Sequence, residues 1–100
     1  LINHKCSFVL FYTNWCPHCT STKPIWNELG ETAVFFDVCS YNCEKYPDHY
    51  KKIRDLKPDF IDGYPTMWVY QGGEPIEKYD GDINVGSLLT RCMNACSIST

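Results

Sequence analysis

An apolar run over residues 7–13 leads directly into the segment Trp15-Cys16-Pro17-His18-Cys19. The run has the length and aromatic content of a buried strand, and the residues after it are typical of a helix. Two cysteines separated by two residues at the head of a helix bring their sulfurs within bonding reach. Cations and helix N-termini stabilise a thiolate, which is the reactive species in disulfide chemistry. The segment therefore predicts a site of thiol–disulfide exchange.

The two cysteines of this segment are expected to have different roles. We expect Cys16 to be exposed and ionised at the helix N-terminus, where it acts as nucleophile and as leaving group. Cys19 lies one turn further along, is more buried, and resolves the mixed disulfide. His18 adds a cation when it is protonated, and Pro17 stiffens the turn. Because a stabilised thiolate makes the disulfide form a stronger oxidant, we expect this site at the oxidising end of its class.

Length and composition favour one packed domain over residues 1–100, with its core at residues 7–96. The net charge of −3 gives no reason to expect binding to nucleic acid or to an anionic membrane. No apolar run is long enough to cross a bilayer. Seven cysteines in such a chain favour an oxidising compartment, the endoplasmic reticulum lumen or a secretory or periplasmic space. No signal peptide is visible, and the first residue, Leu1, leads us to expect that upstream sequence was removed or left out.

The pattern of apolar residues and turn signals predicts seven elements. We expect strands at residues 7–13, 32–39, 66–71 and 75–79, and helices at residues 16–29, 47–56 and 83–95. Pro24 should kink the first helix, Gly30 should end it, and Gly72-Gly73 should form a hairpin turn. The order βαβ, α, ββα implies an α/β fold whose four-stranded mixed sheet is flanked by helices.

A second informative segment, Gly63-Tyr64-Pro65-Thr66, precedes the third expected strand. A proline at the entrance of a central strand removes a ladder hydrogen bond and normally spoils the strand. A cis X-Pro turn can be placed there, although the sequence alone leaves the cis and trans forms open.

Together, the Trp-Cys-x-x-Cys and Gly-Tyr-Pro-Thr segments resemble the thioredoxin superfamily, most closely the catalytic domains of protein disulfide isomerases. The inner Pro-His pair is that of the bacterial disulfide oxidase DsbA. The position of Pro24, the Gly-Gly hairpin and Tyr79-Asp80-Gly81 also fit, so that the resemblance covers residues 8–96. It implies a thioredoxin fold whose first strand and helix are trimmed, with residues 1–5 as their remnant.

The resemblance also implies roles for particular residues. Pro65 would be cis and lie against the two sulfurs, and the backbone of Tyr64 would pair with an extended substrate. Trp15, Tyr64 and Pro65 would form an apolar platform for unfolded polypeptide. The implied activity is that of a thiol–disulfide oxidoreductase biased toward oxidase or isomerase chemistry. It needs no metal, flavin or nucleotide, and it needs a redox partner such as a sulfhydryl oxidase or another disulfide carrier.

The sequence departs from the superfamily where a buried acid usually lies, six positions before the first cysteine. That position is Leu10, and the acid's usual lysine partner falls near Phe35. Because the acid ordinarily helps to move the proton of the buried cysteine, we expect Cys19 to deprotonate less readily and mixed disulfides to resolve slowly.

Other interpretations of the cysteines remain open at the level of sequence. Cys16, Cys19, Cys39 and Cys43 resemble a four-thiolate zinc spacing, and an inert structural disulfide is a further alternative. Cys39 and Cys43 form one close pair and Cys92 and Cys96 another, which leaves Cys6 over. We expect Cys92 and Cys96 to be buried thiols, or a pair where the helix frays. The domain could also act as a reductase, or as a polypeptide-binding module of a larger protein.

Overall fold

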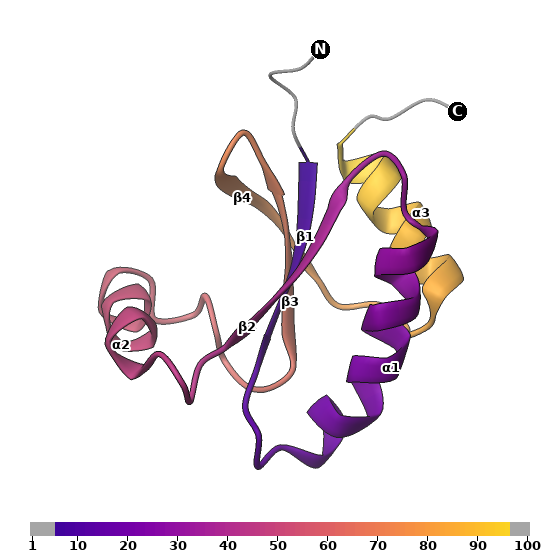
Figure 1. Ribbon diagram of the computed structural model, residues 1–100. Coiled ribbons are helices and arrows are strands. Elements are labelled where there is room, and N and C mark those ends of the chain that lie inside the picture. Colours follow the sequence, from indigo (N-terminus) through magenta and orange to yellow (C-terminus); the bar gives the residue numbers. More distant parts are fainter. Residues whose placement is uncertain (1–5, 97–100) are drawn as a thin grey trace.

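The computed structural model describes residues 6–96, apart from the side chains of residues 49, 50 and 53. Its elements, in chain order, are β1 (Cys6–Tyr12), α1 (Pro17–Thr32), β2 (Asp37–Asn42), α2 (Pro47–Leu56), β3 (Thr66–Gln71), β4 (Glu74–Tyr79) and α3 (Val85–Ala95) (Figure 1). None of the helices in this part of the chain combines the length and the apolar character needed to span a membrane.

The four strands form one mixed sheet in the order β2-β1-β3-β4. β1 pairs with β2 in parallel and with β3 antiparallel, and β3 pairs antiparallel with β4. Figure 1 shows α1 and α3 together on one side of the sheet and α2 on the other. Gly72 and Gly73 have φ values of 63° and 84°, which β-hairpin turns of the primed types require and glycine adopts without strain. The predicted α/β thioredoxin fold and hairpin are therefore confirmed.

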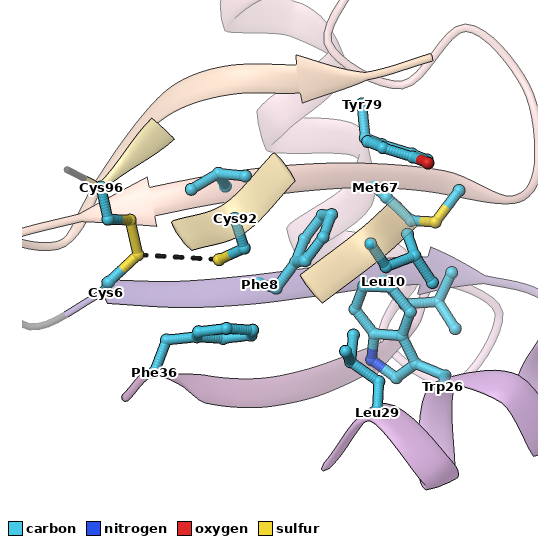
Figure 2. Packing of buried hydrophobic residues seen from close by; sticks show 12 residues of the cluster. Cys6, Phe8, Leu10, Trp26, Leu29, Phe36, Met67, Tyr79, Cys92 and Cys96 are labelled. Atoms are coloured by element: carbon cyan, nitrogen blue, oxygen red, sulfur yellow. Dashed lines mark hydrogen bonds between the residues drawn. A yellow bond between two sulfur atoms is a disulfide. The ribbon is translucent and has the colours of Figure 1, made fainter. Parts of the chain in front are cut away.

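The alternation of side chains along β1 separates two apolar clusters. Phe8 and Leu10 are fully buried beneath α1 and α3, where Trp26 of α1 packs edge-on against Phe8 with 4.9 Å between ring centroids (Figure 2). Phe11 points to the opposite face and packs with Phe60. Because successive strand residues face opposite sides, β1 connects both clusters.

The boundary between the first helix and the second strand differs from the prediction. α1 continues through Pro24 and Gly30 to Thr32, and β2 starts at Asp37. Gly30 does not adopt the left-handed backbone conformation of a glycine that ends a helix. A Cβ atom added at this position would lie 3.7 Å from Val38 Cβ, so the glycine contributes to the packing of α1 against β2 and does not end the helix.

The apolar residues between these two elements are not a buried strand. Val34 and Phe35 are 79% and 55% exposed, and of this run Phe36 alone enters the core. Parallel pairing places Ser40, not Phe35, beside Leu10. The predicted replacement of a buried charge pair by Leu10 and Phe35 is therefore wrong for Phe35, because apolar composition alone does not reveal where pairing begins.

Cysteine pairing also differs from the prediction. A disulfide joins Cys6 to Cys96, with 6.3 Å between their Cα atoms, and Cys92 is a buried free thiol whose Sγ lies 3.7 Å from Cys6 Sγ (Figure 2). The expectation of a buried thiol is therefore confirmed for Cys92 and wrong for Cys96, because Cys6 at the start of β1 lies within bonding reach of Cys96. The last helix starts at Val85, with Asn84 as N-cap, two residues later than expected.

Candidate active site

The N-terminus of α1 is built around Cys16. This residue is the N-cap, with extended backbone (φ −85°, ψ 115°), and its Sγ accepts a hydrogen bond from the Cys19 N–H at 3.3 Å. Pro17 occupies the first helical position, where a missing N–H is without cost. The sulfur therefore replaces the oxygen of an ordinary N-cap side chain and faces the positive end of the helix dipole.

The Tyr64-Pro65 turn lies directly against this sulfur. The Tyr64–Pro65 peptide bond is cis, and Cys16 Sγ lies 3.5 Å from the Tyr64 carbonyl oxygen. The Thr66 hydroxyl donates to the Gly63 carbonyl oxygen and closes the turn from the other side. Two segments that are 48 positions apart along the chain are thus brought together at the helix mouth.

Aromatic side chains form the surface next to the sulfur. Trp15 is 66% exposed and meets the half-buried Tyr64 ring edge to face, with 5.8 Å between centroids. His18 and Pro17 are also exposed. The expectation that Cys16 itself is exposed is wrong: only 4% of its surface is accessible, because its side chain turns inward to the helix N-terminus and the Tyr64 carbonyl.

Cys19 is deeply buried, with 1% of its surface exposed. Burial raises the pKa of its thiol to about 11, and the hydrogen bond and charge of Cys16 act in the same direction. A hydrogen bond from the Thr13 backbone opposes the shift, while the nearby Cys43 adds to it. Cys16 and Cys19 are both free thiols, so the structure represents the reduced state.

Cys43 is a neighbour of the site that the sequence analysis grouped with Cys16 and Cys19 only in the zinc alternative. Its N–H donates to the Tyr12 carbonyl oxygen at 2.9 Å, and its thiol interacts with the Tyr64 side chain. Burial raises the pKa of Cys43, so it is held as a neutral thiol. The signal that could have revealed it is the parallel pairing of β1 with β2, which places the residues after both strands at one edge.

The alternative of a four-thiolate zinc site is not assembled among the described residues. Cys39 is exposed and Cys43 is buried, and both are free thiols. Within residues 6–96, the sulfurs that gather closely enough to hold a metal are those of Cys6, Cys92 and Cys96. Two of these three are joined in the disulfide.

Comparison with known proteins places this geometry in a family. The family model described as Thioredoxin matches residues 1–94. Over 82 residues the chain is 34% identical to protein disulfide-isomerase of Saccharomyces cerevisiae, an alignment that covers 80% of this chain and 15% of that protein. It is 30% identical over 87 residues to a thioredoxin domain-containing protein 5 homolog of Drosophila melanogaster, covering 83% and 19%. It is also 28% identical over 89 residues to the chloroplastic thioredoxin Y1 of Arabidopsis thaliana, covering 88% and 48%.

Solved structures agree with the fold. The J-Trx1 fragment of ERdj5 superposes with a TM-score of 0.75 at 26% identity, covering 94% of this chain and 44% of that one. Human ERp44 in its zinc-bound form superposes with a TM-score of 0.74 at 21% identity, covering 92% and 27%. The chain spans less than half the length of these relatives and structures.

Proposed function

This chain belongs to the thioredoxin family, and from that premise we propose that it exchanges disulfides with protein substrates through Cys16 and Cys19. A substrate thiolate attacks the Cys16 sulfur of the oxidised pair, the Cys16–Cys19 bond breaks, and a mixed disulfide forms. A second substrate thiolate then displaces Cys16, and the pair leaves as two thiols. The two electrons removed from the substrate pass later to a redox partner.

The observation that supports this proposal is the position of Cys16 Sγ. The sulfur accepts the Cys19 N–H at the helix N-terminus and lies against the cis Tyr64–Pro65 turn. A negative charge on this atom is stabilised by the helix N-terminus, which favours Cys16 both as nucleophile and as leaving group. Protonated His18 adds a further positive charge in the same helical turn.

The low exposure of Cys16 sets a requirement for the substrate. A substrate sulfur has to reach Cys16 across the surface formed by Trp15, Tyr64 and Pro65, where an extended chain can pair with the Tyr64 backbone. We therefore infer that unfolded or flexible segments, rather than rigid folded surfaces, are the substrates.

The direction of exchange and the compartment are part of the proposal. A stabilised Cys16 thiolate favours the reduced pair, so that the oxidised form transfers its disulfide outward as an oxidase or isomerase. The relatives named as protein disulfide isomerases support the endoplasmic reticulum lumen, although a chloroplastic thioredoxin is also among the relatives. A sulfhydryl oxidase or another disulfide carrier would reoxidise the pair.

The test is the refolding of a reduced protein that contains several disulfides, in a glutathione buffer. We expect the parent to speed recovery, Cys16→Ser to abolish this effect, and Cys19→Ser to accumulate a mixed disulfide at Cys16 that mass spectrometry detects. Cys39→Ser, which changes an exposed cysteine outside the site, is the matched control. If the parent and Cys16→Ser bind the unfolded protein equally and neither speeds recovery, the domain is a polypeptide-binding module instead.

A further inference from the structure

When Cys19, rather than a second substrate thiolate, resolves the mixed disulfide, it has to lose a proton, and its surroundings oppose this loss. Burial holds the thiol in its neutral form, and Cys16 and Cys43 act in the same direction. Leu10, at the position where the superfamily usually has a buried acid, is apolar and fully buried, so it offers no site for the proton. A route for the proton therefore has to lie elsewhere.

A pocket of about 300 Å³ opens beside Cys19. It lies between the end of β1 and the first turns of α1, and Thr13, Asn14, Cys19, Lys23 and Asn27 are among the residues that line it. A water molecule occupies roughly 30 Å³ in the liquid and needs two to four polar partners in such a place. The pocket has the volume and the polar groups to hold several water molecules beside Cys19.

Thr13, one of the residues that line this pocket, carries an unexplained polar atom. The residue is 5% exposed, and its Oγ1 is a buried side-chain oxygen without a hydrogen-bond partner. Buried hydroxyl groups nearly always have a protein or water partner, because the loss of both is costly. The same residue's backbone already bonds to the Cys19 thiol, which places Thr13 next to the proton in question.

Lys23 supplies the positive charge of the pocket. It lies four residues after Cys19 on α1, and residues at this spacing share one face of a helix. Its Nζ is held by Tyr12, 4.4 Å from the ring centroid and 3.5 Å from the hydroxyl oxygen. The ammonium group is thereby fixed at the pocket rather than left free in solvent.

We propose that this pocket is the exit for the Cys19 proton, with Thr13 and Lys23 as the residues that position the water and favour the thiolate. The Cys19 S–H bond breaks, the proton passes to a water molecule held by the Thr13 hydroxyl, and from there it reaches solvent. The Cys19 thiolate attacks Cys16 Sγ of the mixed disulfide, the bond from Cys16 to the substrate sulfur breaks, and the substrate leaves as a thiolate. Of the titratable groups that act on Cys19, Cys16 and Cys43 are competing thiols. Lys23, held by the Tyr12 phenol, is the cation that lines the same pocket.

The inference rests on the proposed function, and one assay tests the resolving step by itself. Cys16 is loaded with 2-nitro-5-thiobenzoate as a mixed disulfide, and attack by Cys19 releases the coloured anion. The release rate is followed by stopped flow from neutral pH to about pH 12, which includes the raised pKa of Cys19. We expect Thr13→Val and Lys23→Met each to raise the midpoint of the rate profile by about one pH unit, which is about a tenfold loss of rate at neutral pH.

Matched variants separate this role from a structural one. Thr13→Ser keeps the hydroxyl and should restore the parent profile, and Lys52→Met, which changes an exposed lysine on α2, should leave it unchanged. If the release-rate profiles of Thr13→Val and Lys23→Met have the same midpoint pH as the parent profile, the proposal is overturned. So would a rate loss that Thr13→Ser fails to rescue.

A second readout does not depend on exchange. In a Cys16→Ser background, the ¹³Cβ chemical shift of Cys19 reports its ionisation directly. A higher Cys19 midpoint in Thr13→Val and Lys23→Met supports the proton exit even if the protein speeds no substrate refolding, which would count against the proposed function alone. Unchanged midpoints reject the proton exit even if refolding activity is normal.

Discussion

The Cys16 thiol donates a hydrogen bond to the carbonyl oxygen of Tyr64, with 3.5 Å between sulfur and oxygen. This carbonyl belongs to the residue before the cis proline, whose backbone is expected to pair with a substrate chain. The donor exists only while Cys16 carries its proton, because a disulfide sulfur has no hydrogen to donate. Oxidation of the pair therefore removes this hydrogen bond, so that Cys16 no longer competes with a substrate N–H for the Tyr64 carbonyl.

A difference in peptide affinity between the two redox states should follow. We expect a cysteine-free extended peptide to bind the oxidised protein about threefold to tenfold more tightly than the reduced protein at pH 5, the value of about one net hydrogen bond. Isothermal calorimetry on both forms measures this ratio. Equal affinities would show that the Tyr64 carbonyl is not part of the peptide site.

The ring pair of Trp15 and Tyr64 predicts a role in substrate capture. Trp15→Ala should raise KM for a polypeptide substrate by about threefold to tenfold, since such aromatic contacts contribute about 0.5–1.5 kcal/mol. The maximal rate should change little, because the sulfur contacts remain. Tyr46→Ala, which removes a part-exposed aromatic residue outside this pair, is the control. A loss in kcat with unchanged KM would argue against a platform.

Replacement of Leu10 by glutamate tests whether the absence of the superfamily's usual buried acid slows the resolution of mixed disulfides. We expect Leu10→Glu to speed substrate release from the mixed disulfide, because it supplies a proton acceptor on the core side of Cys19. It should also lower the free energy of unfolding by about 3 kcal/mol or more, since it places a carboxyl group in an apolar core. Urea denaturation and the stopped-flow release assay measure the two effects. If Leu10→Gln speeds release equally, the acid is not the cause.

The three sulfurs at the other end of β1 predict a change of disulfide partner. In Cys96→Ala, we expect Cys92 to pair with Cys6, because the two sulfurs are only 3.7 Å apart. Peptide mapping by mass spectrometry identifies the bond, and Cys92→Ala should retain Cys6–Cys96. The double variant Cys92→Ala/Cys96→Ala should lose about 2–5 kcal/mol of stability. A Cys96→Ala protein whose Cys6 stays a free thiol would contradict the prediction.

The buried Cys92 thiol should make the free energy of unfolding depend on pH in the alkaline range. Burial, assisted by the charge of Glu77, raises the pKa of its thiol from 9.0 to about 12. The folded protein therefore holds this proton more tightly than the unfolded chain does, and the free energy of unfolding should fall as pH rises from 9 toward 12. The slope from this one group reaches about 1.4 kcal/mol per pH unit. Denaturation at several pH values should show a shallower decline in Cys92→Ala.

Local patterns were sufficient to predict most of the fold and the elements of the site. The apolar run before Cys16, the Gly72-Gly73 turn and the helical spacing in α3 each depend on neighbours in the chain, and each formed as expected. The segments around Cys16 and Pro65 were recognised because their residue types are unusual at a helix start and a strand start.

What the sequence did not reveal depends on contacts between distant elements. The start of β2 is set by its pairing with β1, and the exposed Val34 and Phe35 look no different in sequence from buried strand residues. The partner of Cys6 and the depth of Cys16 depend likewise on how β1, α3 and the Tyr64 turn meet. The place of Lys23 near Cys19 could have been predicted from the sequence, because the spacing of the two residues puts both on one side of α1.

The bond between Cys6 and Cys96 also determines how the domain bears mechanical load. It links the first residue of β1 to the residue that caps α3, 90 positions later, at the end of the sheet remote from Cys16. A force pulling on the chain from outside these two cysteines would pass through the S–S bond and leave the sheet and helices between them unstretched. The domain should therefore resist extension while the Cys6–Cys96 disulfide is intact, and it should unfold under tension only after that disulfide is reduced.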